Sequence, residues 1–242
     1  AIYQDDKISI EITTTRLLDT TVYVADVTLR DPSCLRTALA QNSFGRNITD
    51  TTSSIAAQNN AILAINGDYY GFRSTGYVMR HGYIYRYVPV DDPSQEDLVI
   101  YEDGSLGIIR ESEVPAQSLE DTDVTDILSF GPGLVIDGEI SVNQDDEVDR
   151  AQVTNPRTAI GVIEPLHYLL VVSDGRTKKS RGLSLYELAG FMKEQGCSFA
   201  YNLDGGGSST MYFMGKVLNN PTTFGDEIAE RGVSDIIYIG RD

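Results

Sequence analysis

Asp204 precedes three consecutive glycines, and this combination has the strongest chemical character in the chain. Glycine accepts positive φ angles and lets backbone N–H groups approach a ligand, and successive N–H groups form an anion-binding concavity. Apolar residues 199–203 and 211–213 flank the loop as predicted strands. A buried carboxylate would be costly in a plain turn, so we expect Asp204 to do chemistry beside a bound anion. The residues predicted to hold that anion or its sugar are Gly205, Gly206, Gly207, Ser208, Ser209 and Thr210.

Three further clusters place charged or amide side chains at the ends of predicted strands, in residues 66–69, 155–158 and 174–176. Arginine suits such a site because its guanidinium binds phosphate through two parallel hydrogen bonds. If the strand that begins at Arg157 pairs antiparallel with the strand that ends near Arg176, both arginines lie at one sheet edge. The residues assigned to substrate binding, with Arg231 as a third cation, are Asn66, Tyr69, Arg157, Thr158, Asp174, Arg176 and Arg231.

The carboxylates leave three functions open. With Asp204 as base or nucleophile and Asp68 as its partner, the site would act on water or on a carbon beside the phosphate. Asp174 would either contact substrate or orient Arg176. Asp68, Asp174 and Asp204 could instead ligate a hard cation through oxygen, as in a metal-dependent phosphodiesterase. The remaining alternative is a non-catalytic module that binds carbohydrate or phosphate.

The elements that must position these side chains are short strands with few helices. Alternating or continuous apolar runs predict strands, and Ser184 with Glu187 forms a capping box that begins a helix closed by Gly196. Asp50 is the expected cap of a second, short helix through Ala57. Loops are expected over residues 33–48, 91–97, 111–126, 143–149 and 216–234, the third with a short helix ending near Leu128. The predicted strands are residues 8–12, 22–29, 61–65, 77–88 as a hairpin, 98–101, 106–109, 130–136, 157–162, 168–172, 199–203, 211–213 and 235–239.

Composition narrows the class of protein. The 242 residues include 41% hydrophobic residues, which supports a substantial core, and the net charge of −17 disfavours nucleic acid as a partner. Two cysteines, Cys34 and Cys197, and two histidines, His81 and His167, offer little material for a thiol nucleophile, a zinc site or a Ser–His–Asp triad. No stretch is long and apolar enough to span a membrane. We expect an extracellular or cell-envelope protein whose signal or anchor was removed before Ala1.

The ordered set of motifs resembles the phosphodiester glycosidase family. The matching pieces are residues 66–70, Gly131-Pro132, residues 156–161, 174–176 and 183–189, and residues 202–210. The resemblance extends from about residue 60 to the C-terminus, whereas residues 1–60 carry little recognisable signal.

The resemblance implies a bacterial hydrolase that cleaves a sugar-1-phosphodiester between the anomeric carbon and the phosphate. No cofactor is implied, although the carboxylates leave a divalent cation open. The expected partner is a small or polymeric sugar-phosphate substrate, with no nucleic acid and no membrane insertion. We expect one α+β domain over residues 1–242, built on a mixed, largely antiparallel sheet system with a few packed helices.

Overall fold

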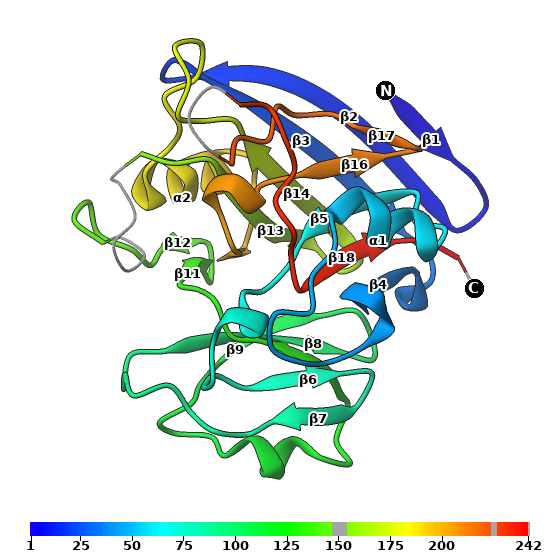
Figure 1. Cartoon of the computed structure of the whole chain (residues 1–242), viewed down its shortest axis with the longest axis vertical. Helices are drawn as coiled ribbons and strands as arrows, with labels where there is room; N and C mark the ends of the chain where they lie inside the picture. The colour runs from blue at the N-terminus through cyan, green and yellow to red at the C-terminus, as the bar shows by residue number, and fades with distance from the viewer. Residues whose placement is uncertain (147–153, 224–226, 242) are drawn as a thin grey trace.

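The computed structural model describes residues 1–146, 154–223 and 227–241 of a single α+β domain (Figure 1). Every strand pair among these residues is antiparallel, within one eight-stranded and two five-stranded sheets. The predicted fold class is therefore confirmed. Antiparallel neighbours bring the start of one strand beside the end of the next, which is how this chain gathers its polar strand ends.

The eight-stranded sheet has the order β1-β2-β3-β14-β13-β15-β11-β12 and forms the central layer. One face packs on α2, and the other contributes to the largest core cluster together with the sheet β17-β16-β5-β18-β4. Its strands are β1 (Ile2–Gln4), β2 (Ile8–Leu17), β3 (Thr20–Leu29), β11 (Gly133–Ile136), β12 (Glu139–Ile140), β13 (Arg157–Glu164), β14 (His167–Ser173) and β15 (Phe199–Asn202).

The second layer is the sheet β17-β16-β5-β18-β4, which α1 (Thr52–Gln58) covers on its outer side. Its strands are β4 (Leu35–Leu39), β5 (Leu63–Asn66), β16 (Met211–Phe213), β17 (Lys216–Val217) and β18 (Asp235–Ile239). The third sheet, β7-β6-β10-β8-β9, lies at the lower end of Figure 1. Its strands are β6 (Val78–Arg80), β7 (Tyr83–Arg86), β8 (Glu96–Tyr101), β9 (Leu106–Arg110) and β10 (Val124–Leu128).

Helix α2 (Leu185–Glu194) begins as the sequence predicts. The Ser184 side chain accepts a hydrogen bond from the Glu187 N–H, and the Glu187 carboxylate accepts one from the Ser184 N–H. Gly196 follows the helix with a φ of 91°, a left-handed conformation that glycine adopts without steric cost. The apolar face of α2 packs against β11, β12 and β15 of the eight-stranded sheet.

Several predictions of local structure were wrong. Strand β8 begins inside the predicted loop at 91–97, and strand β17 lies inside the predicted loop at 216–234. Residues 33–48 contain strand β4, and residues 111–126 lead into strand β10 instead of a helix near Leu128. Both strands pair with neighbours distant in sequence, which outweighs weak local propensity. Helix α1 is capped by the Thr51 hydroxyl and not by Asp50, whose carboxylate binds the Thr51 N–H and the Ser54 hydroxyl. The end of the predicted loop at 143–149 lies outside the described residues.

Short 3-10 helices complete the chain, and one of them, η5 (Gly206–Ser208), forms the glycine-rich loop. The others are η1 (Pro32–Cys34), η2 (Ala40–Asn42), η3 (Tyr70–Phe72) and η4 (Ala116–Leu119). Cys34 and Cys197 are both free and buried, and burial raises the pKa of the Cys197 thiol to about 12. None of the described helices could cross a membrane, given their length and polarity.

Candidate active site

Asn66 links three of the predicted clusters at the junction of the two upper sheets. Its Nδ2 donates to the Asp204 carbonyl at 2.6 Å, and its Oδ1 accepts from the Thr158 hydroxyl at 2.8 Å and the Thr210 N–H at 3.2 Å. The side chain is fully buried. Because a buried amide left without partners costs free energy, these bonds hold the ends of β5, β13 and β15 in one arrangement. The structure thus brings Asn66, Thr158 and Asp204 together.

The glycine-rich loop turns sharply after Asp204. The Gly206 N–H donates to the Pro156 carbonyl at 2.9 Å. The Ser208 and Ser209 N–H groups close the 3-10 turn on the carbonyls of Gly205 and Gly206. Gly206 has a φ of 60°, so a side chain there would be strained. The three glycine amides are thus not all available to one ligand, because the fold itself uses that of Gly206.

The Asp204 carboxylate is close to the surface but mostly desolvated. Its side chain is 10% exposed, and Arg231 donates to Oδ2 at 3.3 Å. Burial raises the pKa of Asp204 to about 6, against the opposing effects of Arg231, the Ser208 hydroxyl and the Gly205 N–H, while the charge of Asp68 raises it further. A carboxyl group with this pKa can exchange a proton near neutral pH, as a general base must.

Two arginines converge on this loop from different elements. The Arg231 Nε donates to the Ser208 Oγ at 3.0 Å in addition to its contact with Asp204. Arg176 donates from Nε and Nη2 to the Asn155 Oδ1 at 3.1 and 2.9 Å. A Cβ added to Gly206 would lie 3.0 Å from the Arg176 Nη2, so the guanidinium rests against the loop backbone.

Arg176 holds this position at an energetic cost. Its φ of 59° is uncommon for a residue with a side chain, and partial burial and the charge of Arg231 both lower the pKa of its guanidinium. Strained backbone is concentrated at functional sites, where the surrounding structure holds it in place. Two guanidinium groups that repel each other beside a loop form a surface that an anion would stabilise.

Asp68 acts on the site from beneath the surface. Its side chain has no exposed area, and its Oδ2 accepts from the Ser129 N–H at 2.9 Å. Arg80 lies 4.0 Å away and forms a buried ion pair with Asp235, whose Oδ1 accepts from the Asp68 N–H at 2.7 Å. The structure therefore separates the two predicted catalytic carboxylates: Asp204 reaches solvent, whereas Asp68 influences it through its charge.

Two other predicted residues have partners that the sequence did not indicate. The Asp174 carboxylate accepts from the Asn220 N–H at 2.8 Å and from the Tyr23 hydroxyl at 3.2 Å. It does not orient Arg176, since Asn155 does so. Burial raises the pKa of Asp174, and this carboxylate anchors the segment that follows β17.

The Arg157 side chain also has a partner within the protein. The β13–β14 pairing is antiparallel, as predicted, with Arg157 opposite Ser173. The Arg157 side chain is buried, however, and its Nε donates to the Leu183 carbonyl at 2.8 Å. Successive side chains of a strand point to opposite faces, so Arg157 lies on the opposite face of β13 from Thr158. The shared sheet edge does not bring the guanidinium groups of Arg157 and Arg176 to one ligand by itself.

The hydroxyl groups of the loop differ in accessibility. The Ser208 Oγ binds Arg231, whereas the Ser209 and Thr210 hydroxyls are buried and lack hydrogen-bond partners within the described part of the chain. Asn219 fixes this segment by donating to the Ser209 carbonyl and accepting from the Met211 N–H, both at 2.8 Å. Of the three predicted hydroxyls, Ser208 is the one joined to the charged groups.

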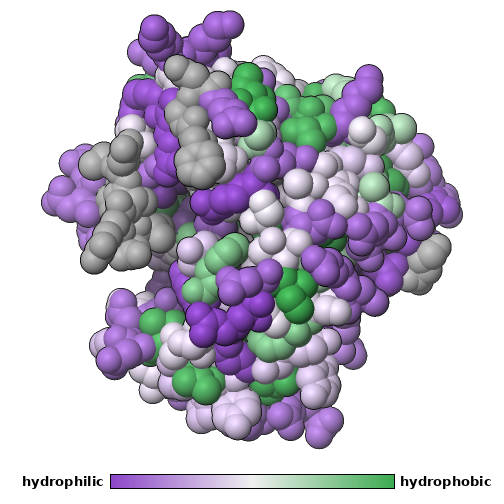
Figure 2. All heavy atoms as spheres, in the orientation of Figure 1, coloured by the Kyte–Doolittle hydropathy of each residue, from purple (hydrophilic) through white to green (hydrophobic). Residues whose placement is uncertain are grey.

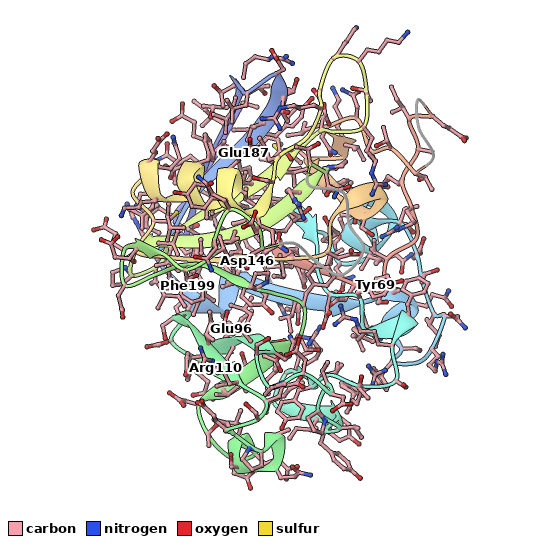
Figure 3. The ribbon with its side chains drawn as sticks, turned by 90° about the vertical axis from the view of Figure 1, so that its left-hand side faces the viewer. Tyr69, Glu96, Arg110, Asp146, Glu187 and Phe199 are labelled. Carbon is pink, nitrogen blue, oxygen red and sulfur yellow. The ribbon has the colours of Figure 1, made fainter. Side chains whose placement is uncertain are left out.

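Tyr69 lies where the lower sheet meets the upper layers (Figure 3). Its ring stacks on Phe72 at 4.9 Å between centroids, and the Arg73 guanidinium lies 5.4 Å from the Tyr69 ring. Arg73 and Phe130 also line a cavity of about 660 Å³. Glu96, Arg110 and Asp146, which Figure 3 labels to the left of Tyr69, line it as well. The Tyr69 ring is thus held by Phe72 and Arg73, and Phe130 is the aromatic ring that lines the cavity.

A metal site is not evident in this geometry. Across residues 1–146, 154–223 and 227–241, no three His, Cys, Asp or Glu side chains are grouped so that they could hold an ion. Asp68 and Asp174 are each engaged by protein hydrogen-bond donors, and Asp204 is paired with a guanidinium.

Comparison with known proteins identifies the family. The model of the phosphodiester glycosidase family matches residues 59–240. The chain belongs to the phosphodiester glycosidase family. The match begins just before β5 and includes every element that carries the site.

The relatives include characterised and uncharacterised proteins. The SPbeta prophage-derived uncharacterized protein YomE of Bacillus subtilis is 32% identical over 201 residues, which cover 81% of this chain and 30% of YomE. The mouse and human N-acetylglucosamine-1-phosphodiester alpha-N-acetylglucosaminidases are each 31% identical over 140 residues, which cover 50% of this chain and 27% of each enzyme. The chain thus spans less than a third of the length of these relatives.

Solved structures share the fold of this phosphodiester glycosidase family member. The zebrafish N-acetylglucosamine-1-phosphodiester alpha-N-acetylglucosaminidase catalytic domain, auto-inhibited by its pro-peptide, has a TM-score of 0.74 at 22% identity. It covers 98% of this chain and 83% of the zebrafish one. A hypothetical protein from Synechocystis has a TM-score of 0.64 at 18% identity, covering 97% of this chain and 62% of that one.

The sequence did not single out Arg80, Asp235 or Asn220. Arg80 and Asp235 form the buried pair behind Asp68, and Asn220 binds Asp174. Arginine in an otherwise apolar strand is the signal that the sequence offers for Arg80. Asn155, which belongs to the predicted cluster of residues 155–158, holds Arg176.

Proposed function

We propose that this protein hydrolyses a sugar-1-phosphodiester between the anomeric carbon and the phosphate. The observation that carries the proposal is the pairing of a partly exposed, desolvated carboxylate with two guanidinium groups on one loop. Arg231 contacts Asp204, and Arg176 rests on Gly206 two residues later. In a protein of net charge −17, such a concentration of cations favours an anionic substrate.

The chemistry follows from the leaving group. A phosphomonoester has a second pKa of about 6 and leaves without much help from an acid. Arg176 and Arg231 would hold the phosphate and stabilise the negative charge that grows as the C–O bond breaks. Asp204 would take the proton of the water that attacks the anomeric carbon, or attack that carbon itself. In either route the oxygen added to the sugar comes from water, and the phosphate departs with its own four oxygens.

The sugar would lie toward the aromatic side of the site. The cavity lined by Phe130 and Arg73, next to Tyr69, offers an aromatic ring and polar groups to the sugar, while the loop beside Asp204 would bind the phosphate. We propose a glycan of the cell envelope or extracellular space as the source of this substrate, because a charged phosphodiester-linked glycan matches the charge of the site. The named substrates of the vertebrate relatives belong to those enzymes.

Asp204→Asn tests this assignment. The amide cannot accept a proton at neutral pH, so we expect kcat for an N-acetylglucosamine-1-phosphodiester to fall by about a thousandfold. Calorimetric binding of the same compound should persist within about threefold, because the two arginines remain. Glu194→Gln, an exposed change of equal charge on α2, is the matched control and should leave kcat unchanged. If the unaltered protein binds the compound but does not turn it over, the protein is a binding module and the proposed function is wrong.

A further inference from the structure

A basic turn directly follows the site. Residues 176–181 read Arg-Thr-Lys-Lys-Ser-Arg, which places four cations in six residues of a chain that has only 19 Lys and Arg against 36 Asp and Glu. We call these six residues the basic turn. It joins β14 to the segment before α2 and includes Arg176 of the candidate active site.

The basic turn has a defined shape. The Arg176 N–H donates to the Arg181 carbonyl at 3.4 Å, and the Thr177 N–H donates to the Ser180 carbonyl at 3.0 Å, so the chain doubles back on itself. Lys178 and Lys179 therefore lie at the tip, and both are exposed.

The turn also packs on the hairpin between β2 and β3, which adds a further cation. Arg16 donates from Nη1 to the Lys179 carbonyl at 2.7 Å, and Arg181 donates from Nε to the Leu18 carbonyl at 2.8 Å. In Figure 1 the yellow turn and the blue hairpin lie side by side at the top, and hydrophilic side chains cover this end of the molecule in Figure 2. Together they enclose an open hollow of about 500 Å³ lined by Arg16, Asp19, Thr177, Lys178, Lys179 and Arg181.

The positive charge of this hollow is only partly compensated. Arg181 pairs with Glu187 at 2.7 Å, and Asp19 lies at the rim. Neither Lys178 nor Lys179 has an ion pair within the described residues, in contrast to Lys7 and Lys193, which pair with Asp31 and Glu139. Exposed lysines left unpaired in a strongly acidic protein create a local positive potential that attracts anions.

Arg176 connects the basic turn to the candidate active site. This residue is the first of the basic turn, and its guanidinium rests on the loop after Asp204. Thr177, the next residue along the chain, already lines the hollow, and Lys178 and Lys179 follow it. A substrate whose phosphate is bound at Arg176 would therefore have further cations close by for its aglycone, the part that leaves with the phosphate.

We propose that the basic turn binds the aglycone of a polymeric substrate whose units are joined by phosphodiesters. This inference rests on the proposed function. A polymer of this kind presents another phosphodiester beyond the one that the site cleaves, and the basic turn supplies cations for it. A rigid nucleic acid would have to approach the acidic remainder of the protein as well, which disfavours it.

Two substrates and two charge variants test the inference. One substrate is N-acetylglucosamine-1-phosphate esterified to a single glycerol, and the other carries a chain of glycerol phosphate units in place of the glycerol. The double variant Lys178→Gln and Lys179→Gln removes the tip of the basic turn. Lys193→Gln with Lys216→Gln removes the same total charge from exposed positions on α2 and β17 and is the control.

We expect the Lys178/Lys179 double variant to lower kcat/KM for the chain substrate about tenfold, as the loss of two exposed cations implies, and for the single-glycerol substrate less than about twofold. The control should change both substrates equally. The advantage of the chain substrate should also shrink as salt rises. Calorimetry with the glycerol phosphate chain alone, added to Asp204→Asn protein, gives the same comparison without turnover.

The outcomes separate the two proposals. If neither substrate is hydrolysed by the unaltered protein, the proposed function fails, and the inference that rests on it fails too. If both are hydrolysed and the Lys178/Lys179 double variant affects them equally, the inference alone is overturned. Equal binding of single-stranded DNA, or of vesicles with anionic lipid, would also overturn it, because the turn would then be a general cationic surface.

Discussion

Removing Arg231 should move the pH dependence of catalysis in a predictable direction. Arg231→Gln deletes the cation that lies 3.3 Å from the Asp204 carboxylate and holds its pKa down. Coulomb's law at that distance, with an effective dielectric constant of about 20, gives an attraction of about 5 kcal/mol. Arg231 is 36% exposed, however, so solvent screening reduces the usable part to about 1–2 kcal/mol.

This energy corresponds to about one pH unit, since one pKa unit equals about 1.4 kcal/mol. Asp204 works as a base in its ionised form, so kcat/KM should rise with pH through about 6 in the unaltered protein. In Arg231→Gln the rising limb should lie about one pH unit higher, because the lost cation no longer favours the carboxylate. The plateau of kcat/KM should also fall about a hundredfold, because one donor to the phosphate is gone.

The assay is the pH profile of kcat/KM for an N-acetylglucosamine-1-phosphodiester under pseudo-first-order conditions. Arg30→Gln, an exposed change of the same charge directly after the end of β3, is the control and should leave the rising limb in place. Arg231→Lys keeps the positive charge, so the rising limb of kcat/KM should stay close to its pH in the unaltered protein, although the planar contact with Ser208 is lost. If the rising limb of kcat/KM stays near pH 6 in Arg231→Gln, the claim that this ion pair sets the pKa of Asp204 is refuted.

Three further predictions concern the support of the site. Asn66→Ala removes three buried hydrogen bonds and should lower the free energy of unfolding by about 2–4 kcal/mol in urea denaturation. A change below about 0.5 kcal/mol would contradict the claim that Asn66 holds the three strand ends together. Gly206→Ala places a Cβ 3.0 Å from Arg176 at a positive φ, so KM should rise about tenfold. The rise of kcat/KM with pH, which Asp204 sets, should stay at the same pH. An unchanged KM would contradict the role of Arg176 in phosphate binding. Burial raises the pKa of Asp204 to about 6, above its value in the unfolded chain, so the protonated carboxyl group stabilises the folded state. This contribution to the free energy of unfolding is complete below about pH 4 and disappears as the pH rises through about 6. Asp204→Asn should remove this pH-dependent component from urea unfolding measured between pH 4 and 7, and an unaltered pH dependence would argue against the raised pKa.

The sequence revealed the parts of the site that depend on local pattern. Three glycines after a carboxylate mark a special loop in any context, and the structure places Asp204 in a sharp turn between β15 and β16. The capping box of α2 is readable for the same reason, because its two members lie three residues apart. Clusters that all lie at strand ends suggested that Asn66, Thr158 and Asp204 could converge, and side-chain hydrogen bonds between two sheets bring them together.

Hydrogen-bond and ion-pair partners that come from distant segments of the chain could not be predicted from local sequence patterns. Arg231 was only a third candidate cation, yet it contacts Asp204, because the return segment before β18 passes over the loop. Arg157 seemed the stronger candidate, but the alternation along β13 turns it toward Leu183. Asp174 similarly looked free for substrate, although Asn220, 46 residues away, occupies it. The face of a strand and the path of a loop decide these contacts, and neither is local.

The burial of Asp68 illustrates a second limit. A carboxylate after an apolar strand is equally compatible with a solvent-facing base and with a buried electrostatic group. The difference depends on Arg80 and Asp235, which arrive on two other strands and close over it. Desolvation of this kind is a property of packing, so only the folded arrangement distinguishes Asp204, which keeps some exposed area, from Asp68, which keeps none.

The most direct test of the central claim is the position of the bond that breaks. Hydrolysis of an N-acetylglucosamine-1-phosphodiester in ¹⁸O-labelled water, followed by mass spectrometry of both products, assigns the oxygen that water supplies. Attack on the anomeric carbon assisted by Asp204 places the label in the sugar and leaves the phosphomonoester unlabelled. Label in the phosphomonoester would mean that the P–O bond breaks, and it would contradict the assignment of this site as a glycosidase.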